Sequence, residues 1–194
     1  LKTATTIGPA DNHRRMSLAE FDHVEVREGY IYELSRGFII VSDVPDPLHL
    51  AMVVEINRQL DRYWDRNPDV IHTLCGGGEC KLLLHDYESE RHPDVSVYKV
   101  PAPRSKHVWA DWIPEIVVEV VSPSSVERDY ILKRDEYLDF GVREYWMIDP
   151  TESYVEVYVL RDGQFVRQGI YGPGQTFTSE VLGGKLIVVD EMLG

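Results

Sequence analysis

The sequence has 194 residues, of which 43% are hydrophobic and 27% charged, so it can bury the core of one domain and is not a mainly disordered chain. Acidic residues outnumber basic residues by 33 to 20, which gives a formal net charge of −13 and an isoelectric point of about 4.9. This balance disfavours a protein that coats nucleic acid by broad charge neutralisation, but it is compatible with a local basic groove.

Targeting and disulfide signals are weak in this sequence. No apolar run approaches the roughly 20 residues that span a bilayer, and Leu1 to Arg15 lack the apolar centre of a signal peptide. Two cysteines, Cys75 and Cys80, cannot build a disulfide framework for a chain of this length. We therefore expect a cytoplasmic protein with both thiols reduced.

The first predicted elements follow a loose arm over residues 1–16. Ser17 and Glu20 have the spacing of a capping box, which predicts the start of a short helix. Two β-rich runs, Tyr30 to Leu34 and Phe38 to Val41, flank a short Ser-Arg-Gly turn and predict a hairpin.

The next segment predicts a long helix and three strands. Apolar residues recur at helical spacing from Leu48 to Trp64. Asp69 to Leu74 and Lys81 to Leu84 predict two strands, with the glycines after Cys75 as a hairpin turn. Alternating valines from Val95 predict a half-buried strand.

The second half of the chain alternates strands with one helix. The run Ile113 to Val121 is almost continuously apolar, which is typical of a strand buried on both faces. Capping-box spacing between Ser124 and Glu127 predicts a helix from about Val126 to Phe140, closed by Gly141.

The remainder of the chain is rich in strands and turns. Further strands are predicted over Glu144–Ile148, Tyr154–Leu160, Gln164–Tyr171 and Lys185–Val189. The whole pattern predicts an α/β (α+β) fold over residues 17–194, with a central mixed sheet flanked by helices and a β-rich C-terminal segment.

Two charged residues occupy positions where the pattern predicts a core. Glu119 lies in the middle of the buried strand, where an unpaired carboxylate would cost several kcal/mol or take up a proton. Lys133 interrupts an apolar stripe that includes Tyr130 and Tyr137 on the predicted helix. Spacing alone leaves open whether this lysine is buried or extends along the helix to water.

Two further carboxylates have ordinary structural explanations when each is taken alone. Asp94 follows Pro93 and is compatible with an aspartate that ends a turn. Glu33 is compatible with the solvated face of an edge strand. Taken together with Glu119 and Lys133, however, these carboxylates could surround a divalent cation such as Mg²⁺ or Mn²⁺, as in sites for phosphoryl transfer.

Several segments with a fixed order resemble one known family. They are Arg91-His92-Pro93-Asp94-Val95, Val118-Glu119-Val120-Val121-Ser122-Pro123-Ser124, Lys133 with Tyr137, Gly141-Val142-Arg143-Glu144-Tyr145-Trp146 and Ile148-Asp149-Pro150. In combination, over roughly residues 17–190, they resemble the Uma-two family of restriction-endonuclease-like proteins, a branch of the PD-(D/E)XK nuclease superfamily.

The resemblance implies a restriction-endonuclease-like core in which Asp94 matches the aspartate of the "PD" element and Glu119 the acid of the "(D/E)XK" element. The superfamily lysine is expected two residues after that acid, where this chain has Val121. Its counterpart is then Lys133 on the following helix, and Glu33 matches an acid from an earlier element. The implied metal ligands are Asp94, Glu119 and the carbonyl of Val120, around Mg²⁺ or Mn²⁺.

Three functions remain open at this point. The first is a metal-dependent endonuclease that hydrolyses phosphodiester bonds, most plausibly in DNA, with Asp94, Glu119, Lys133 and Glu33 as its catalytic residues. The second is a non-catalytic or partner-binding member of the fold, and the third is a metal-dependent hydrolase of a small phosphate ester. A homodimer is a reasonable expectation, because most soluble oligomers are two-fold homomers.

A few other residues carry weaker signals. His49 opens the long helix and could reach the site, and Lys81 and Lys99 are alternatives for the site lysine. The spacing of Cys75 and Cys80 does not fit the usual zinc pairs.

Overall fold

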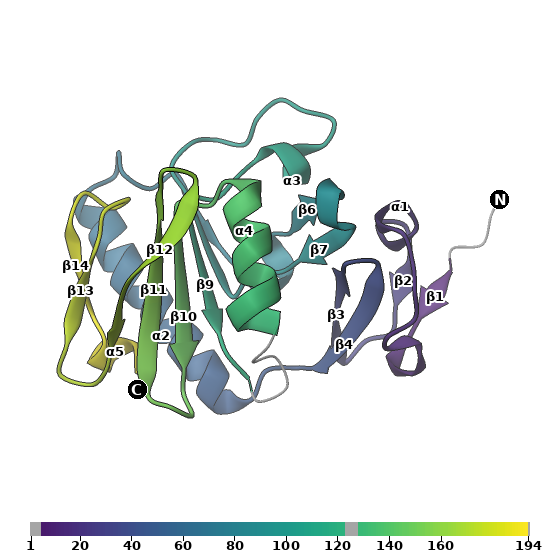
Figure 1. Ribbon diagram of the computed structural model, residues 1–194, viewed down its shortest axis with the longest axis horizontal. Coiled ribbons are helices and arrows are strands. Elements are labelled where there is room, and N and C mark those ends of the chain that lie inside the picture. The colour runs from purple at the N-terminus through teal and green to yellow at the C-terminus, as the bar shows by residue number, and fades with distance from the viewer. Residues whose placement is uncertain (1–4, 123–127, 194) are drawn as a thin grey trace.

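A computed structural model describes residues 5–122 and 128–193 of the chain. Its centre is a six-stranded sheet (Figure 1). In spatial order the strands are β12 (Gln164–Tyr171), β11 (Tyr154–Arg161), β10 (Glu144–Asp149), β9 (Ile116–Val120), β8 (Val95–Tyr98) and β5 (Thr73–Cys75). Only β9 and β10 run parallel to each other, so the sheet is mixed, as predicted.

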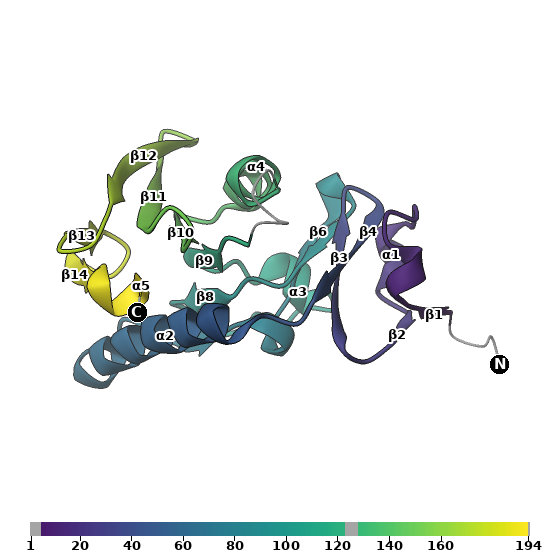
Figure 2. The ribbon, with the colours of Figure 1, turned by 90° about the horizontal axis from the view of Figure 1, so that it is seen from below.

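Helices cover both faces of this sheet. The long helix α2 (Pro47–Arg66) lies on one face, and α4 (Arg134–Phe140) lies on the other (Figures 1 and 2). Side chains of β9 alternate between two cores: Val118 and Val120 pack in the cluster that contains α2, whereas Val117 packs with Tyr137 of α4. Every residue of β9 is buried, which confirms the strand predicted from its apolar run.

A second, four-stranded sheet lies beside the first (Figure 2). Its strands, in spatial order, are β4 (Phe38–Asp43), β3 (Tyr30–Ser35), β7 (Ser89–Arg91) and β6 (Leu82–Leu84). The β3–β4 pair is the predicted hairpin. Leu82 and Leu84 pack in the α4 core, so the two sheets share apolar contacts.

The N-terminal segment was expected to be a loose arm over residues 1–16, and this is wrong for the described residues 5–16. Here β1 (Thr6–Ile7) pairs with β2 (Glu25–Val26), and the 3₁₀ turn η1 (Pro9–Asp11) follows β1. Ile7 is buried with Leu18 of α1 (Leu18–Phe21). An apolar side chain within a polar segment fixes it to the second sheet, a contact that no local pattern reveals.

Short elements complete the chain. They are the 3₁₀ turns η2 (Gly77–Glu79) and η3 (His85–Tyr87), helices α3 (Val108–Asp111) and α5 (Asp190–Leu193), the antiparallel strands β13 (Thr176–Ser179) and β14 (Lys185–Val188), and the π-helical turn η4 (Arg128–Lys133) before α4. The capping box of Ser17 and Glu20 is present at α1. The corresponding start at Ser124 and Glu127 lies outside the described residues.

Two local predictions are wrong. The glycines after Cys75 do not form a hairpin turn, because β5 belongs to the six-stranded sheet and β6 to the four-stranded one. The strand at Val95 is buried on both faces rather than on one, since helices cover the sheet on each side. In the described part of the chain, no helix has the length and apolar character needed to cross a membrane.

Candidate functional site

The pairing of β8 with β9 brings two of the predicted acids together. Val95 pairs with Val118 in an antiparallel register, and continuing that register by one residue places Asp94 opposite Glu119. Asp94 precedes β8, and its Oδ2 accepts a 2.7 Å hydrogen bond from the backbone N–H of Val120. The geometry therefore joins Asp94 to the strand that carries Glu119, next to the main chain of the third predicted ligand.

Lys133 extends into the protein rather than to solvent. Its side chain is 5% exposed, and its Nζ lies 3.0 Å from Oε1 of Glu119. The same ammonium is 3.3 Å from Oδ1 of Asp129 and 3.5 Å from Oε1 of Glu33. Lys133 is thus surrounded by carboxylates from three separate elements, and the alternative in which it extends to water is wrong.

Burial and neighbouring charges shift the titration of this ion pair. Burial and the surrounding carboxylates together raise the pKa of Glu119 to about 8, against the opposing effect of Lys133. Burial acts to lower the pKa of Lys133, but the carboxylates outweigh burial and raise it above its usual value. The lysine therefore keeps its proton, while Tyr137 donates a 2.5 Å hydrogen bond to Glu119.

Glu33 lies among cations. Its carboxylate is 3.5 Å from Arg91 and from Lys133 and 3.8 Å from Arg128, and it accepts a hydrogen bond from the backbone N–H of His92. Burial acts to raise the pKa of Glu33, but the three cations lower it to about 2. Glu33 is therefore a carboxylate near the site lysine, in a position that favours an electrostatic role over metal ligation.

Arg91 links the second sheet to α4 behind the site. Its guanidinium is fully buried and donates from Nε to Glu136 at 2.8 Å and from Nη2 to Ser35 at 2.8 Å. Since the Nη1 group also approaches Glu33, one side chain joins β3, β7 and α4. This connection fixes Glu33 relative to the helix that carries Lys133.

Sequence reasoning missed or underweighted three contributors. Asp129 lies one helical turn before Lys133, and that i, i+4 spacing was the available signal. Arg91 gave no local signal, because burial of its charge depends on pairing between strands far apart in sequence. His49 received little weight, yet its Nε2 lies 2.9 Å from Oδ1 of Asp94.

The alternative lysines do not reach the site cluster. Nζ of Lys81 pairs with Asp22 and Glu90, and Nζ of Lys99 donates to the carbonyl of Val181.

Cys80 is buried and Cys75 is partly buried.

Two cavities border Asp94. One, of about 480 Å³, runs along α2 past His49, and the other, of about 410 Å³, lies against β3. Both are lined by Asp94, Pro45 and Gly77. The neighbouring Gly76 has to be glycine, since a Cβ there would lie 1.9 Å from the carbonyl oxygen of Asp94. Asp94 is thus the member of the cluster that cavities reach from two sides.

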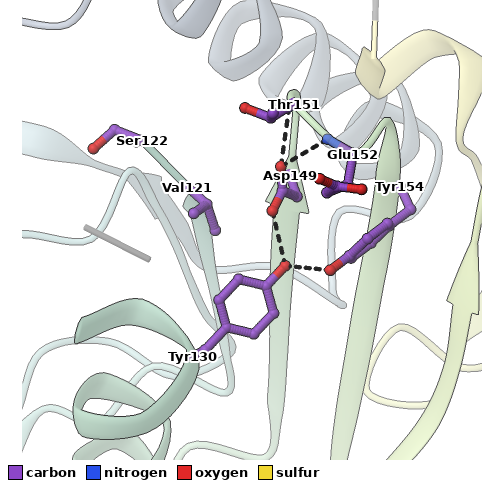
Figure 3. Close-up of a pocket in the computed structure, with 7 residues that line it drawn as sticks. All are labelled: Val121, Ser122, Tyr130, Asp149, Thr151, Glu152 and Tyr154. Carbon is purple, nitrogen blue, oxygen red and sulfur yellow. Dashed lines mark hydrogen bonds between the residues drawn. The ribbon is translucent and has the colours of Figure 1, made fainter. Parts of the chain in front are cut away.

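A third cavity, of about 520 Å³, opens where the parallel strands β9 and β10 end (Figure 3). Tyr130 projects into it and donates to Asp149, and its hydroxyl also shares a 2.6 Å hydrogen bond with the hydroxyl of Tyr154 (Figure 3). The other oxygen of Asp149 accepts the backbone N–H groups of Thr151 and Glu152. The side chains of Tyr130, Asp149 and Tyr154 thus satisfy one another.

Asp94 and Glu119 are suited to a metal ion that takes most of its ligands from water and substrate. Within residues 5–122 and 128–193, no group of three or more histidine, cysteine, aspartate or glutamate side chains has the arrangement of a ready-made metal site. Two neighbouring carboxylates are nevertheless the protein contribution typical of Mg²⁺, which usually keeps waters and takes substrate phosphate oxygens as its other ligands. Asp94 and Glu119 therefore fit magnesium better than a metal that needs an all-protein cage.

The match of a family profile decides the classification. A profile described as "Putative restriction endonuclease", for the family Uma2, matches residues 18–188. The chain belongs to the Uma2 family. This confirms the resemblance to the Uma-two family that the sequence motifs indicated.

A solved structure supports the fold expected for a Uma2 protein. The crystal structure of a putative nuclease belonging to DUF820 from Anabaena variabilis is similar to this chain with a TM-score of 0.70 and 18% identity, over 92% of this chain and 97% of that one. The fold is restriction-endonuclease-like, as predicted. A comparison with curated proteins found no match.

Proposed function

We propose that this Uma2 protein is a metal-dependent endonuclease that hydrolyses phosphodiester bonds in DNA. The observation that carries the proposal is the ammonium of Lys133, buried 3.0 Å from Glu119 on the strand next to Asp94. Burying a lysine among carboxylates costs free energy, which supports a functional role for this cluster, and two cavities reach its neighbour Asp94. Membership of a family described as restriction endonucleases supports the same activity.

Asp94, Glu119 and the carbonyl of Val120 would hold Mg²⁺ or Mn²⁺. When bound, such an ion supplies a Lewis acid for a phosphate oxygen and lowers the pKa of a coordinated water. Asp94 bonds to His49 and Glu119 accepts from Tyr137, so both acids would have to exchange these contacts to hold such an ion.

Lys133 positions the attacking water and offsets negative charge at the phosphate. Its raised pKa keeps the ammonium charged, which suits electrostatic stabilisation rather than proton abstraction. Glu33 and Asp129 also lie within 3.5 Å of the ammonium and would help to hold it in place. Arg128, whose side chain is 18% exposed, is the cation of the cluster best placed to meet a phosphate from solvent.

The two other functions are less well supported. A non-catalytic scaffold would be expected to pack Lys133 among apolar side chains, but carboxylates surround it. A hydrolase of a small phosphate ester would be expected to enclose its substrate in one pocket, whereas two cavities extend from Asp94 in different directions. Space on both sides of the acid suits a chain that passes across it.

Cleavage assays test the proposal. The wild-type protein should cut DNA with Mg²⁺ or Mn²⁺ and lose that activity in EDTA, and Glu119→Gln should reduce the rate by at least about a hundredfold, the usual effect of removing one electrostatic contributor. RNA and a chromogenic phosphodiester serve as alternative substrates. Equal activity in wild type and Glu119→Gln would rule out this site.

Glu144→Gln is the matched control. Glu144 is also buried and lies on β10, the parallel neighbour of β9, but at the opposite end of this strand pair from Glu119. Its carboxylate accepts hydrogen bonds from the hydroxyl of Ser179 and the N–H of Val181. A comparable loss of activity in both variants would indicate a general effect of removing a buried carboxylate rather than a role at the site.

A further inference from the structure

The cavity against β3 combines an aromatic and apolar wall with a polar one. Phe21, Val24, Val26, Tyr30, Ile31 and Tyr32 form the first wall. The second contains Lys81, Glu90 and His92, where Glu90 bridges the Lys81 ammonium at 3.1 Å and Nε2 of His92 at 3.1 Å. Its volume of about 410 Å³ lies within the range of about 300–1,000 Å³ that is usual for small-ligand sites.

One buried hydroxyl at this cavity lacks a partner. Tyr32 is 6% exposed and lines the cavity, yet its hydroxyl makes no hydrogen bond with any residue that the structure describes. An unpaired buried hydroxyl destabilises a protein by about 1–3 kcal/mol unless something else satisfies it. The hydroxyl of Tyr98, away from the cavity, also lacks a partner among the described residues, so the Tyr32 hydroxyl supports a ligand only together with the shape and chemistry of the cavity that it lines.

The charges at the cavity favour an uncharged ligand over an anionic one. Asp22, Glu90 and Asp94 contribute three carboxylates, against the ammonium of Lys81 and the imidazole of His92. A phosphate would be repelled here, whereas a nucleobase is flat and uncharged and carries donors and acceptors along its edge. Exposed Tyr30 provides a surface for stacking, the contact by which proteins commonly hold an unstacked base.

The position of the cavity next to Asp94 indicates which nucleotide of the substrate would supply such a base. Asp94 belongs to this cavity and to the pair of acids proposed to hold the metal. A base that occupies the cavity therefore belongs to a nucleotide next to the phosphate that is cut. We propose that the cavity between β3 and Lys81 receives one nucleobase of the substrate strand, an inference that rests on the proposed nuclease function.

Nucleoside binding tests the pocket directly. Saturation-transfer NMR with adenosine and with thymidine, neither of which carries a phosphate, should detect binding to the wild type in EDTA. Tyr32→Phe should weaken that binding by about 2- to 10-fold, the usual effect of one hydrogen bond, without lowering the melting temperature of the free protein. Tyr98→Phe is the matched control, because Tyr98 is buried but does not line the cavity.

An abasic scan tests the pocket in the substrate. A labelled single-stranded 12-mer is prepared with one abasic nucleotide at each position in turn, and its binding is followed by fluorescence anisotropy with Ca²⁺ in place of Mg²⁺. One abasic position next to the cleavage site should weaken wild-type binding by on the order of tenfold. The same position should have no effect in Tyr30→Ala, which has already lost the stacking surface.

The outcomes separate this inference from the proposed function. Cleavage of DNA together with a flat abasic scan and no nucleoside binding would overturn the base pocket and leave the nuclease intact. Nucleoside binding that Tyr32→Phe weakens, without any cleavage, would overturn the nuclease and support the pocket. A Tyr30→Ala variant that changes only the sedimentation of the protein would show an interface between copies and overturn the inference.

Discussion

Lys133 is the residue on which the candidate site depends most. Three carboxylates approach its ammonium within 3.5 Å, and none of the four groups is more than slightly exposed. Coulomb attraction in such a site is strong, but removing these charges from water is expensive as well. Within the cluster, the attraction between the charges offsets the cost of removing them from water, so loss of one charge should destabilise the fold.

Replacement of the ammonium should destabilise the fold. Lys133→Met leaves Glu119, Glu33 and Asp129 without their shared cation, and we expect the free energy of unfolding to fall by about 3–5 kcal/mol, as measured by urea denaturation. Lys99→Met removes one lysine hydrogen bond elsewhere and should cost no more than about 1.5 kcal/mol. Similar losses in the two variants would contradict a special role for the Lys133 cluster.

Acid should weaken the protein through Glu33. Its folded pKa is about 2 against an ordinary value of 4.5, so it stabilises the fold above pH 4.5 and that stabilisation is lost as the pH falls towards 2. Glu119 acts in a different window, because its raised pKa of about 8 makes its contribution decline as the pH rises from 4.5 to 8.

The acid effect can be isolated by comparing two proteins. Urea midpoints measured from pH 5 to pH 2 should fall more steeply in the wild type than in Glu33→Gln, which has no proton to take up at this position. Parallel curves over that range would show that the cations around Glu33 do not hold its carboxylate ionised in the folded state.

At the scale of elements, the loop between β5 and β6 determines how Asp94 is presented. Gly77 donates its N–H to the carbonyl of Pro93, and Gly76 lies directly against the carbonyl of Asp94. The loop thus packs on the backbone of the acid from the cavity side. Gly76 is therefore required for the close approach of two chain segments rather than for a turn between paired strands.

A single added methyl group should reveal this contact. Gly76→Ala places a Cβ 1.9 Å from a backbone oxygen, so the loop or Asp94 has to move, and we expect a loss of about 1–3 kcal/mol in the free energy of unfolding together with reduced cleavage. Gly78→Ala is the control, since nothing lies within 4 Å of its added Cβ. Its stability should stay within about 0.5 kcal/mol of the wild type.

The elements show how far the sequence can predict this structure. Apolar and β-rich patterns correctly predicted α2, the β3–β4 hairpin and the buried strand β9, and a capping box predicted α1, because those signals are local. The assignment of β5 and β6 to different sheets was not predictable in this way, since both strands are short and their partners are distant in sequence. The strand β13 carried no clear pattern and was missed.

The same limit applies to the site. Glu119 and Lys133 were recognisable because a charge in an apolar stripe conflicts with its surroundings, and the structure brings them together. Asp129 and Arg91 looked like ordinary polar residues in the sequence, and only tertiary packing shows them buried. The roles of all these residues, including Glu119, Lys133, Asp94 and Glu33, remain predictions for the assays above.

At the scale of the whole molecule, the net charge of −13 would limit how the proposed nuclease holds DNA. Long-range repulsion opposes the approach of a phosphate backbone, so binding has to rely on the few cations at the site. Lys133 and Arg91 are buried, and Arg128 is only partly exposed. Few counterions should therefore be released when DNA binds.

The salt dependence of DNA binding measures the number of counterions released. At a constant concentration of Ca²⁺, the slope of log affinity against log salt concentration for a single-stranded oligonucleotide should be no steeper than about −2, which corresponds to two or three phosphate contacts. Anisotropy titrations from 50 to 300 mM KCl give the slope directly. A slope near −6 would indicate an extended basic surface that the charge distribution does not predict.

The ammonium of Lys133 faces a carboxylate that lies one hundred residues earlier in the chain, on a separate sheet. During synthesis, Glu33 leaves the ribosome long before its partner, and Arg91, which fixes it against α4, also waits for Glu136. An unfinished polypeptide thus has no assembled reaction centre, whatever parts of it have already folded. A nuclease of the kind proposed would by this arrangement gain its reaction centre only after the last side chain of the cluster has been translated and packed.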